Sequence, residues 1–263
     1  MNSIGPGEGS SMLDRFGLIL DAIEEAEYLT LTGVMERTGL ARSTTHRLLI
    51  QMERRRWLFR VGTNYELGPR LFNLGTTGVR NHWFHRSARP ALQRLHLRTG
   101  QLVHLAFLSG TDVVFWDKLG SGRHDAAGVG QIGGSVPAHA AAVGKALLAS
   151  QPSGIASTAR PFPALTEKTL SSRAALQKEL ESVQRKGYAM DAGEFQSGIG
   201  CIATTVHAGV DDPSSAYRTT AAISLCVPLD RLDSRLVDPL MVAKTQIMQQ
   251  LRVNPMVDPP ASC

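Results

Sequence analysis

Residues 39–49 read Gly-Leu-Ala-Arg-Ser-Thr-Thr-His-Arg-Leu-Leu, and this stretch decides how the amino-terminal part of the chain folds. At helical spacing Leu40, Thr45, Leu48 and Leu49 fall on one face, which we expect to pack inward. The other face is polar and basic. Near the start of a helix, hydroxyl groups and free backbone N–H groups can hold phosphates, and arginine can read guanine edges. Taken alone, this face could equally be a solvated surface.

The segments around this stretch favour DNA binding over a solvated surface. A helix, a short helix, a turn with glycine and a second long helix follow one another, and a hairpin comes directly afterwards. This order is typical of a winged helix-turn-helix. We expect helices at residues 12–26, 31–38 and 41–56, and strands at 57–61 and 65–67 around Gly62-Thr63-Asn64.

The basic charge is concentrated in the same part of the chain. The chain has 28 Lys+Arg and 23 Asp+Glu; residues 1–100 contain 14 Arg, no Lys and 9 acids, which leaves 14 of each sign for residues 101–263. Arginine suits bidentate contacts with phosphates and base edges better than lysine does. Arg54-Arg55-Arg56 could stabilise the end of the helix through its dipole or contact phosphate. The candidate DNA-binding residues are Arg42, Ser43, Thr44, His46, Arg47, Arg55 and Arg60.

The composition of the 263 residues, with 43% apolar and 19% charged side chains, is that of a globular protein. It excludes disordered, collagen-like and coiled-coil chains. No apolar run reaches 18 residues, so we expect no membrane span. Three widely spaced cysteines form no disulfide framework, and the Gly/Ser-rich start resembles a loose tail rather than a signal peptide, so we expect a cytoplasmic protein.

The remainder of the chain predicts an α+β domain in which helices pack on an antiparallel sheet. Residues 70–99 are helical in pattern but are expected to break at Pro90. A helix is expected to start after Pro137. We predict a DNA-binding domain at 12–74, a linker helix at 75–88, an effector-binding domain at 89–252 and loose tails at 1–11 and 253–263. Strands are expected at 101–108, 112–119, 188–192, 201–206 and 219–227, and helices at 140–150, 171–186 and 231–251.

Two segments of the second domain suggest a ligand site. Residues 134–146 place small side chains at the start of a helix, where free N–H groups and the helix dipole favour a carboxylate. The alternative is tight packing of this helix on the sheet. Residues 191–203 form a glycine-rich bend that brings an acid, Asp191, near a thiol, Cys201. Because Ser224 and Cys226 share one face of the last strand, these side chains could line a single cavity.

Taken together, these segments resemble the IclR family of bacterial transcriptional regulators from about residue 12 to about residue 251. Each matching piece is short, but their order and spacing agree with the family. The pieces are Thr38-Gly39-Leu40 with Ser43-Thr44 and Arg47-Leu48-Leu49, residues 65–71, Ala88-Arg89-Pro90, residues 137–149, Gly187-Tyr188, Glu194-Phe195 with Gly198 and Cys201, and residues 221–224.

The resemblance implies an amino-terminal winged helix-turn-helix joined to a carboxy-terminal GAF/PAS-like α/β effector-binding domain. It implies dimers, often paired into tetramers, on palindromic operator DNA, and small organic or aromatic acids as effectors, without a cofactor. Cys226-Val227 depart from the Ser-Gly that the family often has. Carried onto this chain, the effector-lining positions are Ala142, Val143, Asp191, Ile199, Cys201, Ser224 and Cys226.

Three further expectations concern alternatives and assembly. An enzyme with Cys201 as nucleophile and His139 as base would need the two side chains close together. A metal sensor could use Cys201, His139, His207 or Asp191, although zinc-type spacing is absent. Subunit pairing is expected to involve apolar residues that a single linker helix could not bury, namely Leu71, Leu74, Trp83 and Phe84.

Overall fold

The computed structural model describes residues 11–120, 130–151, 162–208 and 219–253. The chain divides into two compact units, Met1–Asn81 and His82–Cys263, which are described separately. In the described part of the chain, no helix combines the length and apolar character needed to cross a membrane. The predicted tails at 1–11 and 253–263 lie outside the described residues, except for Ser11 and Val253.

The first unit has the predicted winged helix-turn-helix order. Helices α1 (Met12–Ala26), α2 (Leu31–Thr38) and α3 (Arg42–Arg54) precede strands β2 (Leu58–Val61) and β3 (Asn64–Leu67). A third strand that the sequence did not predict, β1 (Tyr28–Thr30), pairs antiparallel with β3, so the sheet order is β1-β3-β2. Helix α4 (Pro69–Asn81) follows the wing and buries none of its own residues.

Local chemistry sets the ends of these helices. The Ser11 side chain accepts a hydrogen bond from the Asp14 N–H while Asp14 accepts one from the Ser11 N–H, which is a capping box. Gly39 ends α2 in the left-handed conformation with φ of 67° and donates its N–H to the Met35 carbonyl. The helices enclose a core of fully buried side chains, including Ile19, Ile23, Val34, Leu48, Leu49, Met52 and Leu58.

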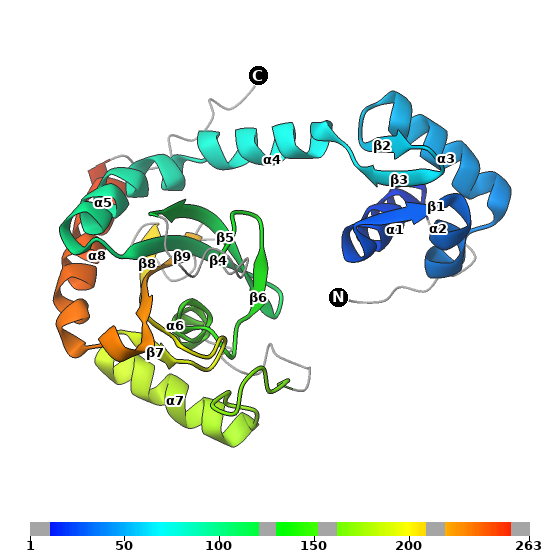
Figure 1. The fold of residues 1–263 in the computed structure, drawn as a ribbon. Helices are drawn as coiled ribbons and strands as arrows, with labels where there is room; N and C mark the ends of the chain where they lie inside the picture. Colours follow the sequence, from blue (N-terminus) through cyan, green and yellow to red (C-terminus); the bar gives the residue numbers. More distant parts are fainter. Residues whose placement is uncertain (1–10, 121–129, 152–161, 209–218, 254–263) are drawn as a thin grey trace. The chain divides into compact units, whose positions relative to one another are not determined.

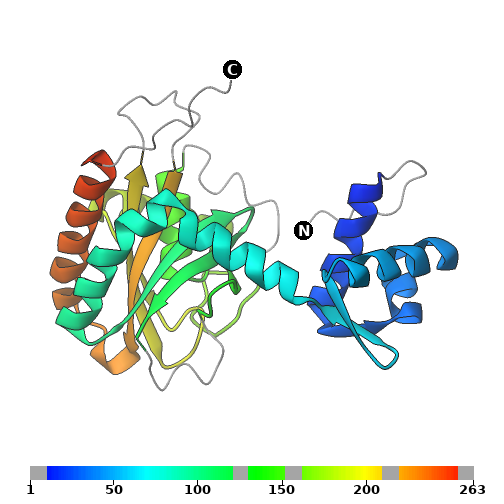
Figure 2. The same ribbon diagram turned by 90° about the horizontal axis from the view of Figure 1, so that it is seen from above.

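The second unit is built on one six-stranded sheet, in which every pairing is antiparallel. Figure 1 shows the sheet curling around one helix, α6, and Figure 2 shows α5 and α8 side by side along the opposite face. The strand order is β6-β5-β4-β9-β8-β7. The strands are β4 (Leu102–Ser109), β5 (Asp112–Leu119), β6 (Ser135–Pro137), β7 (Ala189–Ala192), β8 (Ile199–Ala208) and β9 (Thr219–Pro228), and the helices are α5 (Trp83–Thr99), α6 (Ala142–Ser150), α7 (Arg173–Lys186) and α8 (Val237–Val253).

Helices cover both faces of this sheet, and each face has its own core. On one face α6 and α7 pack on small strand residues such as Ala106, Ala203 and Ala222. On the other face α5 and α8 pack on larger residues such as Leu105 and Ile202. The alternation of side chains along each strand separates the two sets. The α6 face therefore combines small apolar residues with any polar residue that falls in the same register.

Three sequence predictions about helix limits were wrong. The break in residues 70–99 lies at His82, whose backbone is extended, and α5 continues through Pro90. Because Pro90 has no N–H group, the carbonyl of Arg86 lacks its usual helical partner. Both residues are exposed, so water can bind that carbonyl. Helix α6 starts at Ala142, because the short strand β6 and a turn follow Gly134 first. The last helix starts at Val237, after two 3-10 turns at Leu229–Arg231 and Ser234–Leu236.

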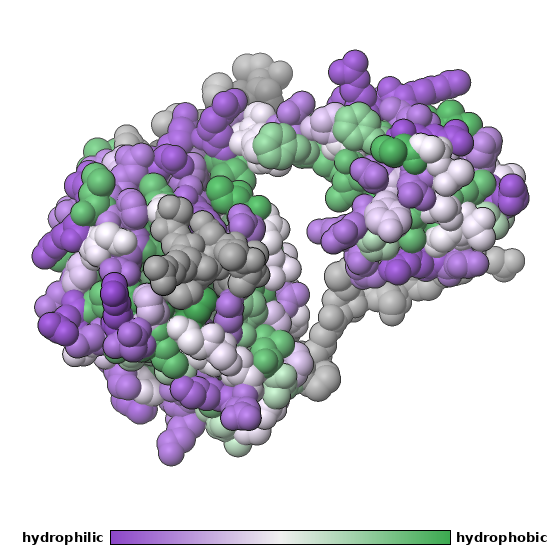
Figure 3. All heavy atoms as spheres, viewed as in Figure 1, coloured by the Kyte–Doolittle hydropathy of each residue, from purple (hydrophilic) through white to green (hydrophobic). Residues whose placement is uncertain are grey.

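The two aromatic residues expected at the subunit interface, Trp83 and Phe84, pack instead against the core of the second unit. Phe84 is fully buried in the core beneath α5, and Trp83 is half-buried against the same core. On α4 the exposed large apolar residues are Phe72 and Leu74, which are 71% and 49% exposed. Figure 3 shows pale and green, less polar side chains along this helix. An apolar surface thus remains on α4 but excludes Phe84.

Candidate DNA interface and effector site

Helix α3 presents the polar face that the sequence predicted. Arg42, Ser43, His46 and Arg47 are exposed and Thr44 is half-buried. Leu48 and Leu49 are buried on the opposite side, in the core of the first unit. The helix thus carries two arginines, a histidine and two hydroxyl groups on its outer side within its first two turns.

The start of α3 leaves backbone donors available. Its N-cap, Ala41, has no side-chain oxygen to accept their hydrogen bonds. The hydroxyl of Thr45 is buried and points backwards, 3.1 Å from the Ala41 carbonyl and 3.4 Å from the Leu40 carbonyl. Thr45 therefore fixes the turn between α2 and α3, and the first N–H groups of α3 remain suited to a phosphate.

The wing residues are exposed but partly held within the first unit. The Nε atom of Arg60 donates to the Gly62 carbonyl at 3.0 Å, and its guanidinium lies 5.7 Å from the centre of the Tyr65 ring. Arg55 is exposed just past the end of α3. Arg60 therefore shapes the wing turn in addition to carrying charge there.

The predicted effector residues meet on the α6 face of the second sheet. Asp191 lies opposite Cys201 in the β7–β8 pairing, and Cys201 lies opposite Cys226 in the β8–β9 pairing. Ser224 lies two residues from Cys226, so it shares that face. Ile199, on the same face of β8, and Ala142 and Val143 at the start of α6 are buried. Cys201 packs in the same core cluster as Ala142 and Val143.

A histidine that the sequence analysis did not single out joins this group. His104 on β4 lies directly opposite Ser224, and it is 2% exposed. Its Nδ1 atom is 3.7 Å from the Sγ atom of Cys226, and its ring lies 4.9 Å from the centre of the Phe115 ring. Among the described residues, neither its Nε2 atom nor the Ser224 hydroxyl has a hydrogen-bond partner. A polar residue inside the apolar run of β4 was the available signal.

Helix α6 lies unusually close to the chain before it. A Cβ atom on Gly144 would collide with the backbone of Ala138, so only glycine fits at this position. Every residue from Ala142 to Ala149 is buried. Tight packing therefore explains Gly144, and the start of the helix, at Ala141, has no side-chain cap.

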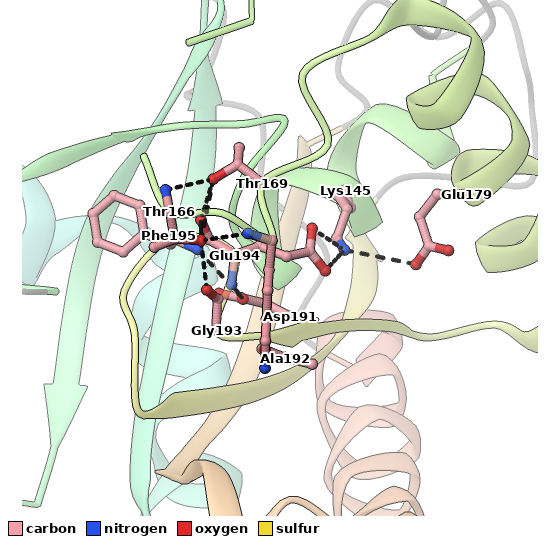
Figure 4. A network of polar contacts seen from close by, with 10 residues as sticks. Lys145, Thr166, Thr169, Glu179, Asp191, Ala192, Gly193, Glu194 and Phe195 are labelled. Atoms are coloured by element: carbon pink, nitrogen blue, oxygen red, sulfur yellow. Dashed lines mark hydrogen bonds and ion pairs between the residues drawn. The ribbon is translucent and has the colours of Figure 1, made fainter. Parts of the chain in front are cut away.

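A buried ion pair connects α6 to the bend between β7 and β8, as Figure 4 shows. Lys145 is fully buried, and its Nζ atom donates to both carboxylate oxygens of Glu194, at 2.7 and 2.8 Å. Glu179 on α7 lies 3.6 Å from the same nitrogen. The lysine thus joins two helices and a loop, and its position inside an apolar helix could have indicated this role.

Asp191 shapes this bend and is therefore partly structural. Its Oδ1 atom accepts the N–H of Glu194 at 2.6 Å and that of Phe195 at 3.4 Å, while Thr169 donates its hydroxyl to the Glu194 carbonyl at 2.6 Å (Figure 4). Burial raises the pKa of the Asp191 carboxyl to about 6, and the negative charge of Glu194 raises it further. The two backbone N–H donors and the positive charge of Lys145 lower this pKa but do not cancel the rise.

Of the residues that the alternative functions would use, Asp191 and Cys201 lie opposite each other in the β7–β8 pairing, whereas His139 and His207 contact other groups. The Nε2 atom of His139 lies 3.0 Å from the Pro163 carbonyl, and its ring packs on Phe162, so the imidazole beside a cysteine is that of His104. His207 lies between the hydroxyls of Thr205 and Thr220. In residues 11–253, gaps excepted, no group of three His, Cys, Asp or Glu side chains is placed to hold a metal ion.

Comparison with known proteins confirms the resemblance found in the sequence. The family model of the IclR helix-turn-helix domain matches residues 12–62, and that of the bacterial transcriptional regulator IclR C-terminal domain matches residues 77–251. The HTH-type transcriptional regulator XynR of Escherichia coli (strain K12) is 32% identical over 221 residues, which cover 82% of this chain and 85% of XynR. The HTH-type transcriptional regulator BhcR of Paracoccus denitrificans (strain Pd 1222) is 32% identical over 235 residues, which cover 87% of this chain and 81% of BhcR.

Solved structures agree with this assignment. An IclR homolog from Microbacterium hydrocarbonoxydans, crystallised with 4-hydroxybenzoate, superposes with a TM-score of 0.74 at 25% identity, and the match covers 93% of this chain and all of that one. A putative transcriptional regulator from Rhodococcus sp. RHA1 gives 0.72 at 25% identity, over 92% and 98% of the two chains. XynR, BhcR and the repressor IclR of Escherichia coli (strain K12) are all transcriptional regulators. The chain therefore belongs to the IclR family of DNA-binding bacterial transcriptional regulators.

Proposed function

We propose that this regulator reads its operator through α3, with Arg42, His46 and Arg47 reaching base edges and Ser43 and Thr44 holding phosphates. The observation that carries the proposal is the exposed polar face of α3 beside a helix start without a side-chain cap. Arg55 and Arg60 extend the basic surface to the sugar–phosphate backbone. One recognition helix reads only a half-site, so the operator is palindromic and the protein acts as a dimer or a pair of dimers in the cytoplasm.

The test is selection of bound sequences from a random duplex DNA library with the full-length protein, followed by gel shifts on the enriched sequence. Arg47→Ala lowers the affinity by roughly 5- to 150-fold, the equivalent of about 1–3 kcal/mol for a base contact. Arg98→Ala is the matched control, because it removes the same charge from an exposed position in the second unit. Equal affinities of these two variants would remove Arg47 from the interface, and a selection without enrichment would contradict sequence-specific binding.

We further propose that the effector is a small aliphatic or aromatic carboxylate, bound between the start of α6 and the facing strands. Free N–H groups at Ala142 and Val143 would hold the carboxylate. The buried hydroxyl of Ser224, which lacks a partner among the described residues, supports a hydrogen bond to the ligand. Asp191 repels a second anion less because its pKa is raised, and Ile199, Cys201 and Cys226 supply an apolar and soft wall.

A thermal-shift screen of small acids, including the 4-hydroxybenzoate present in the related crystal structure, identifies the ligand. Calorimetry then compares variants. Ala142→Trp fills the site and abolishes binding, whereas Ser224→Ala weakens it roughly 5- to 10-fold, as expected for one lost hydrogen bond. Unchanged binding by Ala142→Trp would place the effector elsewhere. Effector binding changes DNA affinity only if it favours one arrangement of the dimer over another.

A further inference from the structure

Cys201 and Cys226 are placed as a pair of opposed thiols. They are direct cross-strand partners in the antiparallel β8–β9 pairing, and both are free and half-buried. Opposed residues in antiparallel strands have Cα atoms about 4.5–5.5 Å apart, which falls within the range of about 4.4–6.8 Å that disulfides span. Both side chains lie on the α6 face, so their Cβ atoms point to the same side of the sheet.

The surroundings of the pair distinguish the two thiols. His104 lies 3.7 Å from the sulfur of Cys226, and its second nitrogen has no partner among the described residues. The hydrogen bond with Cys201, followed by the contacts with His104, lowers the pKa of the Cys226 thiol well below the ordinary value for cysteine. The same hydrogen bond and burial raise the pKa of the Cys201 thiol. Because His104 lies beside the sulfur of Cys226, Cys226 is the better placed of the two to act as the nucleophile, with Cys201 as its partner.

We propose that Cys201 and Cys226 form a reversible disulfide when a small peroxide reaches them, with Cys226 attacking first and His104 serving as its proton store. This inference is independent of the identity of the effector and of DNA recognition. Two opposed thiols and an imidazole in one cross-strand group carry it.

The chemistry balances in two steps. The Cys226 thiolate attacks one peroxide oxygen, an S–O bond forms, the O–O bond breaks, and the leaving hydroxide takes the proton that His104 holds and becomes water. The sulfur of Cys201 then attacks the sulfur of the Cys226 sulfenic acid, the S–S bond forms, and the S–O bond breaks. The second hydroxide takes the Cys201 proton. The two thiols lose two electrons, and the peroxide is reduced to two water molecules.

The experiment uses full-length Cys263→Ser protein, so that only Cys201 and Cys226 remain. Treatment with hydrogen peroxide should lower the intact mass by about 2 Da, the mass of two hydrogen atoms, and leave neither thiol open to alkylation. Dithiothreitol should restore the original mass and both thiols. His104→Gln reaches the same product roughly tenfold more slowly, because the thiolate loses its neighbouring proton store. Peptide mapping locates the link between β8 and β9.

Matched variants make the outcome decisive. Cys201→Ser stops at a sulfenic acid on Cys226 that dimedone traps, and Cys226→Ser shows neither the mass loss nor the trapped acid under the same treatment. The proposal is overturned if both thiols remain alkylatable, if the product is a sulfinic acid without a disulfide, or if the link joins two chains rather than two strands. An unchanged rate for His104→Gln would overturn the role given to the imidazole.

Discussion

At the scale of single residues, the second unit combines a buried cation with one buried carboxyl group, that of Asp191, and one partly buried carboxyl group, that of Glu194. Lys145 neutralises Glu194, but Asp191 shares the same bend and has no cation of its own within the described hydrogen bonds. Burial raises the pKa of the Glu194 carboxyl as well, although Lys145 opposes the rise. The bend is thus stabilised by hydrogen bonds and charge, and its stability depends on pH.

Replacing Asp191 by asparagine should change the pH dependence of stability. The folded pKa of about 6 lies above the ordinary value of 3.8, so the folded state retains a proton that the unfolded state releases. The free energy of unfolding therefore falls as pH rises from about 4 to about 6. The asparagine side chain stays neutral and can still accept both N–H bonds, so Asp191→Asn is more stable above pH 6, by up to about 3 kcal/mol.

Urea denaturation at several pH values checks this expectation. The two proteins should have equal midpoints near pH 4 and diverge above it, with the variant higher. A difference of constant size across the whole range would show that Asp191 does not carry the proton.

Removing the buried cation should destabilise the fold strongly. Lys145→Met leaves Glu194 without its partner, and breaking a buried pair in this way costs about 3–5 kcal/mol. The double variant Lys145→Met/Glu194→Gln removes both charges and should recover a large part of that loss. Denaturation midpoints of the two variants measure the coupling, and equal losses in both would argue against the ion pair.

At the scale of elements, the sequence predicted the helices and strands whose apolar residues recur regularly over many positions, and it missed the short elements without such a repeat. Helix α3 was recognisable because Leu48 and Leu49 recur in step with Leu40. Strand β1 was missed because its three residues offer no alternation, and they are a strand only because β3 lies beside them. The break at His82 was missed because proline is the usual signal, whereas Pro90 lies on an exposed face. Strand β1 and the break at His82 both depend on packing against distant parts of the fold, which the local sequence does not reveal.

The candidate site could be predicted only in part for the same reason. Asp191, Cys201 and Ser224 were proposed from glycine spacing, alternation and family resemblance, and the structure places them on one face of the sheet. His104 and Lys145 were missed because they come from strands and helices distant in sequence, and only the strand register places His104 opposite Ser224. A single polar residue in an apolar element is the residual signal.

Two helical glycines should respond oppositely to the same substitution. Gly144→Ala places a methyl group against the backbone of Ala138 and forces α6 to shift, so we expect a loss of roughly 2 kcal/mol or more. Gly17→Ala in α1 meets no atom within 4 Å, so its better helix propensity should stabilise the protein by up to about 1 kcal/mol. Thermal unfolding of both variants tests this pair, and a harmless Gly144→Ala would contradict the close approach.

At the scale of the whole molecule, the distribution of apolar surface predicts self-association. Helix α4 buries no residue in the protomer, yet Phe72 and Leu74 are among its side chains. Large exposed apolar side chains on one helix typically mark an interface. This surface is where we expect a second copy of the chain to pack.

Phe72→Glu should shift the protein towards monomers at micromolar concentration, because it places a charge in that interface. Light scattering measures the change, and gel shifts should show weaker operator binding. Asn73→Glu adds the same charge to the same helix without removing an apolar contact, so it serves as the control. A dimer that survives Phe72→Glu unchanged would move the interface off α4.

Two glycines in α4 make this helix unstable on its own. Gly75 and Gly78 meet no neighbouring atom within 4 Å, and each costs a helix about 1 kcal/mol relative to alanine. A helix of this length is marginal on its own in water. If subunits pair along α4, its winding and their association become a single equilibrium. Amide protons in this helix would then exchange slowly in concentrated solution and quickly on dilution, so that hydrogen exchange there reports how much of the protein is assembled.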